Sequence, residues 1–213
     1  MLQDNHKNWA HEGRDTYLMN IFILDKNVET SVSYYMDTHV NKILLEACQV
    51  ACSAHHLAVK PRNYIPYKLS HANHPVCRWA RESIEHYWKV VDYAEALRNE
   101  YHHRYGKNHG CTKVVYWLQD NEPMLPDYYE EVIPLAVDPQ AKSIYQARSI
   151  EESVETYRYY YAVAKQHLAK WTNRPRPSWY PPVKLSNENK EQQASIEVFD
   201  DNYIANVNRL VLL

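Results

Sequence analysis

The sequence contains only three glycines among its 213 residues. Glycine-rich phosphate loops and tight β-hairpins both depend on glycine, so a nucleotide-binding α/β enzyme and a hairpin-rich β fold are disfavoured. Cysteine is also scarce, with four residues, and the sequence shows neither a signal peptide nor an apolar run of about 18 residues. We therefore expect a cytoplasmic protein with reduced thiols and no membrane partner.

Phenylalanine is scarce as well, with two Phe compared with 19 Tyr and 6 Trp. Most aromatic side chains therefore carry a polar group that needs a hydrogen-bond partner when buried. The formal net charge is only −2, yet residues 60–113 hold ten Lys or Arg against five Asp or Glu. A nucleic acid would thus meet a local basic face on a protein that is not basic overall.

Apolar residues that recur every three or four positions predict helices, and clustered prolines interrupt them. We expect a mainly α protein, a compact single-domain helical bundle with long irregular Pro-rich connectors. Asn27 is expected to cap the first helix and Gly106 to end the second. The predicted helices are 28–57, 76–105 and 149–170, with a short element at 113–118 and connectors at 58–75 and 121–140.

The remaining segments set the expected domain limits. The apolar run at residues 20–24 predicts either one strand or the lead-in to the first helix. Residues 1–18 are polar and lack periodicity, so we treat them as a disordered N-terminal extension of a helical domain at 19–182. The tail at 183–213 becomes apolar again near its end and is expected either to dock as a helix or to bind a partner.

Ionisable groups are dense in the middle of the first predicted helix. Asp37, His39, Lys42 and Glu46 lie along adjoining helix faces beside an apolar stripe. Such a set suits general acid–base work or stabilisation of a cationic transition state. The alternative is a solvated face with an ion pair between Lys42 and Glu46.

Cations and amides surround the start of the second predicted helix. Asn73 and His74 precede it, while Arg78 and Arg81 lie one turn apart and can grip one anion together. The alternative is a helix cap with surface ion pairs. Arg104, near the end of this helix, belongs to a third cationic and aromatic stretch, where the helix dipole alone would favour positive charge.

The segment 157–182 combines aromatic rings, cations and prolines. Cations attract phosphates, and flat rings accept stacked bases, so it predicts a DNA-contacting segment. The alternative is a Pro-rich tail that folds back on the core. Its candidate DNA-binding residues are Lys170, Trp171, Arg174, Arg176, Trp179 and Tyr180. The cations and the amide of the earlier segments are candidate DNA-binding residues as well, namely Lys42, Asn73, Arg78, Arg81 and Arg104.

The first predicted helix offers zinc-ligand residue types, since Cys48, Cys52, His55 and His56 have helical spacing. The paired Cys-x-x-Cys motif of zinc sites is missing, and a Cys on an apolar helix face is more often part of the core. We therefore expect no metal and no cofactor.

The segments Asp37–Lys42, His74–Ser83 and Arg104–His109 resemble those of a group of uncharacterised phage proteins. The order of elements from Met19 also resembles phage-type pyrimidine-dimer DNA glycosylases (endonuclease V), compact all-α proteins. In that family an Arg-Pro-Thr-Trp-Tyr segment touches DNA around the lesion, and it matches Arg174, Trp179 and Tyr180 here.

This resemblance implies a DNA glycosylase that flips out and excises a damaged or modified pyrimidine, including a phage hypermodified one. The family's catalytic glutamate suggests Asp37 first and Glu46 second, with His39 or His74 at the departing base. The family's nucleophile is the α-amine of its processed N-terminus, whereas residues 1–18 precede Met19 here, so we expect no lyase activity. The alternatives are a non-catalytic DNA-binding protein and a transferase that modifies DNA pyrimidines.

Overall fold

The computed structural model describes residues 20–127, 134–135 and 149–181. These residues form α-helices and one 3-10 turn, and no strand occurs among them, which confirms the expected mainly α fold. In chain order the elements are α1 (Val28–Ser33), α2 (Asp37–His56), α3 (Pro75–Ala80), α4 (Ile84–Tyr105), α5 (Thr112–Asp120), α7 (Ile150–Ala164) and η1 (Gln166–Leu168).

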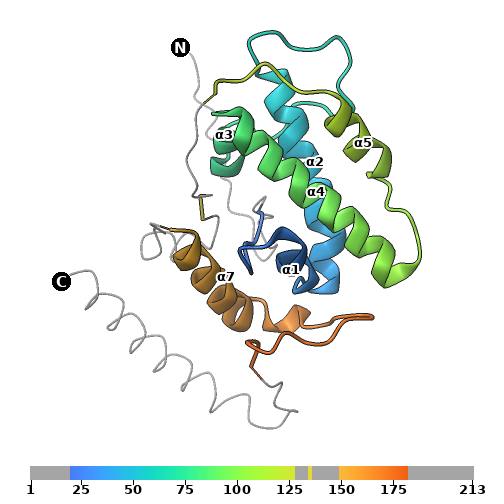
Figure 1. Cartoon of the computed structure of the whole chain (residues 1–213), viewed down its shortest axis with the longest axis vertical. Helices are drawn as coiled ribbons and strands as arrows, with labels where there is room; N and C mark the ends of the chain where they lie inside the picture. The colour runs from blue at the N-terminus through green and yellow to red at the C-terminus, as the bar shows by residue number, and fades with distance from the viewer. Residues whose placement is uncertain (1–19, 128–133, 136–148, 182–213) are drawn as a thin grey trace, which may run out of the picture.

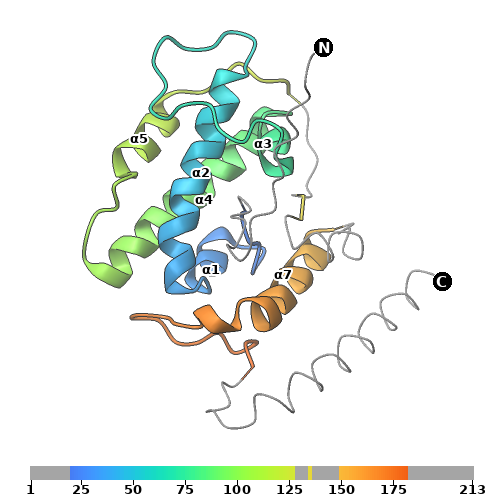
Figure 2. The ribbon, with the colours of Figure 1, turned by 180° about the vertical axis from the view of Figure 1, so that it is seen from behind.

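The two longest helices, α2 and α4, cross at the centre of the molecule (Figure 1). α1 packs beside α4, and α5 packs on α4 beyond the loop that follows it. Figure 2 shows the same pair from behind, with α3 and α7 on one side of it and α5 on the other. Among the described residues, no helix combines the length and the hydrophobicity that a membrane crossing requires.

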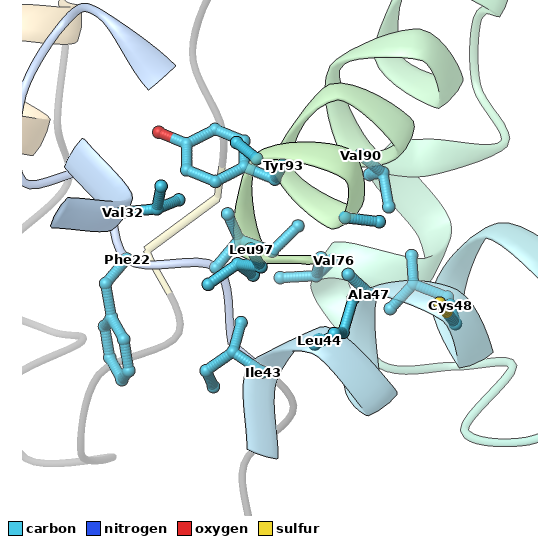
Figure 3. Packing of buried hydrophobic residues seen from close by; sticks show 14 of the residues in the cluster. Phe22, Val32, Ile43, Leu44, Ala47, Cys48, Val76, Val90, Tyr93 and Leu97 are labelled. Carbon is cyan, nitrogen blue, oxygen red and sulfur yellow. The ribbon is translucent and has the colours of Figure 1, made fainter. Parts of the chain in front are cut away.

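Buried side chains of α2 and α4 meet in the core between them, as Figure 3 shows for Ile43, Leu44, Ala47, Val90 and Leu97. The spacing of these residues within each helix is the three-to-four-residue repeat that predicted the helices. All five are at most 2% exposed, so this contact is closed to solvent.

The predicted helix 28–57 is in fact two helices, α1 and α2, separated by Tyr34–Met36. In one continuous helix, the carbonyls of Ser33 and Tyr34 would accept hydrogen bonds from residues four positions further on. Here Arg104 Nη2 donates to the Ser33 carbonyl at 3.0 Å, and Trp171 Nε1 donates to the Tyr34 carbonyl at 2.8 Å. Partners distant in the sequence therefore replace the helical hydrogen bonds and allow the break.

The predicted helix 76–105 is also divided, into α3 and α4. Ser83 begins the second part, because its hydroxyl oxygen accepts a hydrogen bond from the His86 N–H at 3.2 Å. The expected stop at Gly106 is confirmed, since this residue has a left-handed φ of 61°. The cap of α1 is confirmed too, with Asn27 Oδ1 accepting from the Thr30 N–H at 2.8 Å.

The apolar run at residues 20–24 is the buried lead-in to α1 rather than a strand. Its backbone finds side-chain partners, because Tyr35 Oη donates to the Phe22 carbonyl at 2.6 Å and Ser31 Oγ accepts from the Leu24 N–H at 2.9 Å. Arg158 of α7 donates to the Leu24 carbonyl at 2.7 Å. These hydrogen bonds give partners to backbone N–H and C=O groups of this segment, because no strand pairs with it among the described residues.

The last predicted helix, 149–170, is shorter than expected, since α7 ends at Ala164 and η1 follows. The connector at 58–75 is confirmed as irregular up to Pro75, which opens α3. The expected extension at 1–18, the tail at 183–213 and most of the second half of the connector at 121–140 lie outside the described residues.

Candidate functional site

Two polar clusters lie along α2, and we name them by their central residues. The Glu46 cluster consists of Asn20, His39, Lys42, Glu46 and Tyr161. His39, Lys42 and Glu46 are three and four residues apart, so they share one face of α2. That face meets the lead-in segment through Asn20 and α7 through Tyr161.

Glu46 is a buried carboxyl, with 7% of its surface exposed. Its Oε2 accepts a hydrogen bond from the Asn20 N–H at 3.2 Å, and Lys42 Nζ lies 3.8 Å from its Oε1. Burial raises the pKa of Glu46 to about 7, and the Asn20 hydrogen bond and the Lys42 charge offset it only in part. Near neutral pH both the acid and the carboxylate form are therefore populated, as general acid–base catalysis requires.

His39 is a buried neutral imidazole two turns before Glu46 on the same face of α2. Burial, followed by the charges of Lys165, Lys42 and His167, lowers the pKa of His39 to about 3. Its Nδ1 lies 2.6 Å from Tyr161 Oη, within hydrogen-bond distance. A neutral imidazole held in this way can donate or accept one hydrogen bond at neutral pH.

Aromatic rings of the lead-in segment and of α7 close the other side of this cluster. The Phe22 ring centroid lies 4.9 Å from those of His39 and Tyr161 and 5.5 Å from that of Tyr157. Tyr157 Oη donates to Asn20 Oδ1 at 2.9 Å, which holds the lead-in segment in place.

Asn20 and Tyr161 belong to this cluster but were not among the site residues predicted from the sequence. Two buried tyrosines one turn apart on α7, each needing a polar partner, were the available signal.

The second cluster, the Arg104 network, consists of Asp37, Glu100, Arg104, Thr172 and Arg174. The Arg104 side chain is fully buried, and its Nε donates to Glu100 Oε1 at 2.7 Å while its Nη1 donates to Asp37 Oδ1 at 2.9 Å. The predicted contact of Arg104 with DNA is therefore corrected, because this guanidinium ties α4 to the start of α2 and does not face solvent.

Both carboxylate oxygens of Asp37 accept hydrogen bonds. Besides Arg104, Oδ1 accepts from the Thr172 N–H at 2.9 Å, and Oδ2 accepts from Thr172 Oγ1 at 2.7 Å. Burial alone would raise the pKa of Asp37, but the hydrogen bonds from Thr172 and Arg104 outweigh it and lower the pKa. A carboxylate held in this way supports the fold, so of the two predicted carboxyls only Glu46 has a pKa near neutral pH.

Arg174, matched by resemblance to a DNA-contacting residue, pairs with Glu100 through two hydrogen bonds, from Nε at 3.0 Å and from Nη2 at 2.7 Å. Burial would raise the pKa of Glu100, but Arg174 and then Arg104 lower it below its ordinary value. One third of the Arg174 side chain is exposed. Its charge is therefore largely used in joining the C-terminal segment to α4.

The aromatic residues after η1 pack on the body, as the folded-back alternative expected. Trp171 bonds to the Tyr34 carbonyl, and its ring centroid lies 5.0 Å from that of Tyr180. The Arg158 guanidinium lies 5.2 Å from the half-buried Trp179 ring. Tyr180 is only 2% exposed, so its predicted stacking on a base is corrected: the ring is already covered by protein.

The predicted residues around α3 divide between structural and exposed groups. His74 Nδ1 accepts from the Val76 N–H at 3.3 Å and caps the helix, while Arg81 Nη1 donates to the Cys77 carbonyl at 3.3 Å. Asn73 and Arg78 are exposed. α3 meets α4 near His86, whereas Arg174 meets it at Glu100, so the two segments contact α4 roughly 20 Å apart.

Exposed cations remain at the end of the molecule that carries the Arg104 network. Lys170 is exposed although its carbonyl accepts from the Asp37 N–H at 2.9 Å, and Arg176 is exposed on the next turn of chain. His103 Nε2 lies 3.3 Å from the Asn173 carbonyl on the same surface. Within the described ranges, no group of three His, Cys, Asp or Glu side chains is placed to hold a metal ion.

Compared with protein-family models, curated proteins and solved structures, the chain matches none of them. The resemblance to phage-type glycosylases therefore stays a prediction from the sequence. In the part of the chain that the structure describes, one face of α2 carries a half-ionised carboxyl, a cation and a neutral histidine, at Glu46, Lys42 and His39.

Proposed function

We propose that this protein is a DNA glycosylase that excises a damaged or modified pyrimidine, with Glu46 as its acid–base carboxyl. The observation that carries the proposal is the burial of Glu46 with a pKa of about 7, next to the cationic Lys42 and on the same face of α2 as neutral His39. The catalytic pKa of a general acid or base is best placed near the working pH, and among the candidate carboxyls Glu46 fits that requirement while Asp37 does not.

The chemistry follows from the bond to be broken. The N-glycosidic bond is inaccessible inside a duplex, so the nucleotide must first leave the stack. As the bond breaks, the sugar becomes oxocarbenium-like, and the carboxylate of Glu46 would stabilise that charge and orient the attacking water. His39, neutral and held by Tyr161, would hydrogen-bond the departing base.

Cations near this cluster suit a polyanionic substrate. Lys42 is half-buried at its rim, and the charges of Lys165 and His167 are close enough to lower the pKa of His39. Lys170 and Arg176 extend positive charge over the adjoining surface. Phosphates flanking a flipped nucleotide would meet these groups first, while the bulk of the protein stays weakly acidic.

The expected absence of lyase activity also has a physical argument. The nitrogen next to Glu46 is the peptide N–H of Asn20, which donates to Glu46 Oε2 at 3.2 Å. A peptide nitrogen is not nucleophilic and forms no Schiff base, so water is the attacking group in this proposal. Borohydride should therefore trap no covalent adduct between the full chain and DNA. A trapped adduct would contradict the monofunctional mechanism.

The decisive experiment incubates the protein with normal, ultraviolet-irradiated and hypermodified phage DNA and measures released bases by mass spectrometry. Release from one modified substrate is expected, and Glu46→Gln should abolish it while DNA binding remains. Glu155→Gln, which changes an exposed carboxylate on α7, is the matched control and should act like the wild type. Tight binding without release from any substrate would instead support the non-catalytic alternative, and unchanged release by Glu46→Gln would remove Glu46 from its role.

A further inference from the structure

A second candidate site lies between the loop of residues 57–74 and α5, at the C-terminal end of α2. Both Figure 1 and Figure 2 show this loop beside α5, at the end of the molecule away from residues 170–181. A hollow of about 450 Å³ opens there, within the size range of small-molecule sites. It is lined by Pro61, Arg62, Asn63, Tyr64, Trp117 and Asn121.

The loop that forms one wall has an unusual composition for an exposed segment. Residues 57–69 contain three cations, Lys60, Arg62 and Lys68, and no acid. They also expose apolar and aromatic side chains, with Val59 at 77% and Tyr64 at 67%. Clustered exposed apolar groups commonly mark a binding surface, and the cations indicate an anionic ligand.

The hollow carries two aromatic rings, one edge-on to the other. The Trp117 and Tyr64 centroids are 6.1 Å apart with their planes at 83°. Trp117 is supported from the core by buried His55, whose ring centroid lies 4.8 Å away and whose Nε2 lies 3.0 Å from Tyr87 Oη. A flat ring entering this hollow can therefore stack on one aromatic face and meet the edge of the other.

Polar groups beside these rings have unused hydrogen-bonding capacity. Arg62 Nη2 donates to the Glu122 carbonyl at 3.1 Å, and Arg62 forms no ion pair in the described chain. Asn121 donates its Nδ2 to the Trp117 carbonyl at 2.7 Å, which leaves Oδ1 as an acceptor. The Asn63 amide has no hydrogen-bond partner among the residues described. The hollow thus offers a guanidinium for phosphate and amides for the edge of a base.

We propose that this hollow binds a nucleotide, with the base against Tyr64 and Trp117 and the phosphate at Arg62. A free mononucleotide and a nucleotide of single-stranded DNA present this same chemistry. The site adjoins His55, nine residues along α2 from Glu46 and so about 14 Å away along the helix axis. It goes beyond the proposed glycosylase activity and does not depend on it.

Calorimetric titration of the full chain with thymidine, thymidine monophosphate and adenosine monophosphate tests this proposal, together with anisotropy of a labelled oligothymidylate. Tyr64→Ala should weaken nucleotide binding about tenfold. Arg62→Gln should weaken binding of the phosphate-bearing probes and leave the weaker binding of thymidine unchanged. Tyr116→Ala and Lys113→Gln change exposed α5 residues that do not line the hollow and should bind like the wild type.

Binding of the monophosphates would identify a free-nucleotide site, and binding of the oligonucleotide alone would identify a single-strand site; either result supports the proposal if Tyr64→Ala reduces it. Absence of binding to every probe, or equal loss in the Tyr116→Ala and Lys113→Gln controls, would overturn it. Glu46→Gln should leave this affinity unchanged. Base release by a protein that binds none of these probes would therefore reject this site alone and leave the glycosylase proposal standing.

Discussion

The carboxyl group of Glu46 accepts a hydrogen bond from the backbone N–H of Asn20 at 3.2 Å, although 26 positions separate the two residues in the sequence. This contact closes the lead-in segment over α2 and removes Glu46 from water. A single backbone donor compensates only part of the cost of burying a carboxylate, so the protonated form is favoured. The reactivity proposed for Glu46 thus comes from the way in which the chain before α1 is folded.

The first prediction concerns stability and Glu46. Its pKa is about 7 in the folded protein and about 4.5 in the unfolded chain, so between these pH values only the folded state keeps the proton. The contribution of Glu46 to stability therefore falls as pH rises through this window. Urea denaturation should show that Glu46→Gln gains about 3 kcal/mol relative to the wild type between pH 4.5 and pH 8. Parallel stability curves for the two proteins would contradict the shifted pKa.

The second prediction concerns the pair of His39 and Tyr161. Tyr161→Phe leaves a buried imidazole nitrogen without its hydroxyl partner, which should cost about 1–3 kcal/mol in urea denaturation at pH 7. Tyr160→Phe is the matched control, since Tyr160 is half-buried and should tolerate the loss of its hydroxyl. Equal stability of the two variants would show that the 2.6 Å contact contributes nothing.

His39 also predicts a pH dependence of opposite sign to that of Glu46. With a folded-state pKa of about 3 against an ordinary 6.5, the imidazole takes up a proton only in the unfolded chain between these values. Stability should therefore fall as pH is lowered from about 6.5, and the fall should be steeper in Glu46→Gln, where the opposing contribution is gone. Denaturation at half-unit pH steps checks this. A shallower fall in Glu46→Gln would contradict the assignment of the two signs.

The fourth prediction tests whether Asp37 serves the fold or the chemistry. Asp37→Asn removes a charge that Arg104 and Thr172 hold, leaves the buried guanidinium with less compensation, and should destabilise the protein by about 3 kcal/mol. Asp120→Asn, an exposed site at the end of α5, should be neutral. Full stability of Asp37→Asn together with complete loss of base release would instead return Asp37 to the catalytic role first predicted for it.

The fifth prediction concerns the exposed cations after η1. Arg176→Gln and Lys170→Gln should each weaken DNA binding and reduce the slope of log affinity against log salt concentration by about 0.9, because each removes one phosphate contact. Both side chains are exposed, so melting temperatures should stay unchanged. Lys113→Gln, in the cation-rich stretch 60–113, tests in parallel whether that stretch binds DNA. Salt slopes equal to that of the wild type would place the DNA-binding surface elsewhere.

The sequence alone determined the helical fold and the outer ends of most helical segments, though not the breaks inside two of them. Apolar spacing placed the cores of α2 and α4, since burial of a helix face leaves a three-to-four-residue repeat in the sequence. Asn27 and Gly106 marked ends that depend on local hydrogen bonding and local backbone conformation. The group of His39, Lys42 and Glu46 was also visible, because residues that share a helix face can be identified by counting.

Only the tertiary structure decided what those groups do. Counting along the helix made both Asp37 and Glu46 candidates, and the resemblance ranked Asp37 first. Their pKa values move in opposite directions, because Arg104 and Thr172 outweigh the burial of Asp37, while Lys42 and the Asn20 N–H offset the burial of Glu46 only in part. The break before α2 and the burial of Arg104 likewise depend on partners from the other end of the chain. Burial and long-range pairing set the charge state of a side chain, and neither can be predicted from the residues next to it in the sequence.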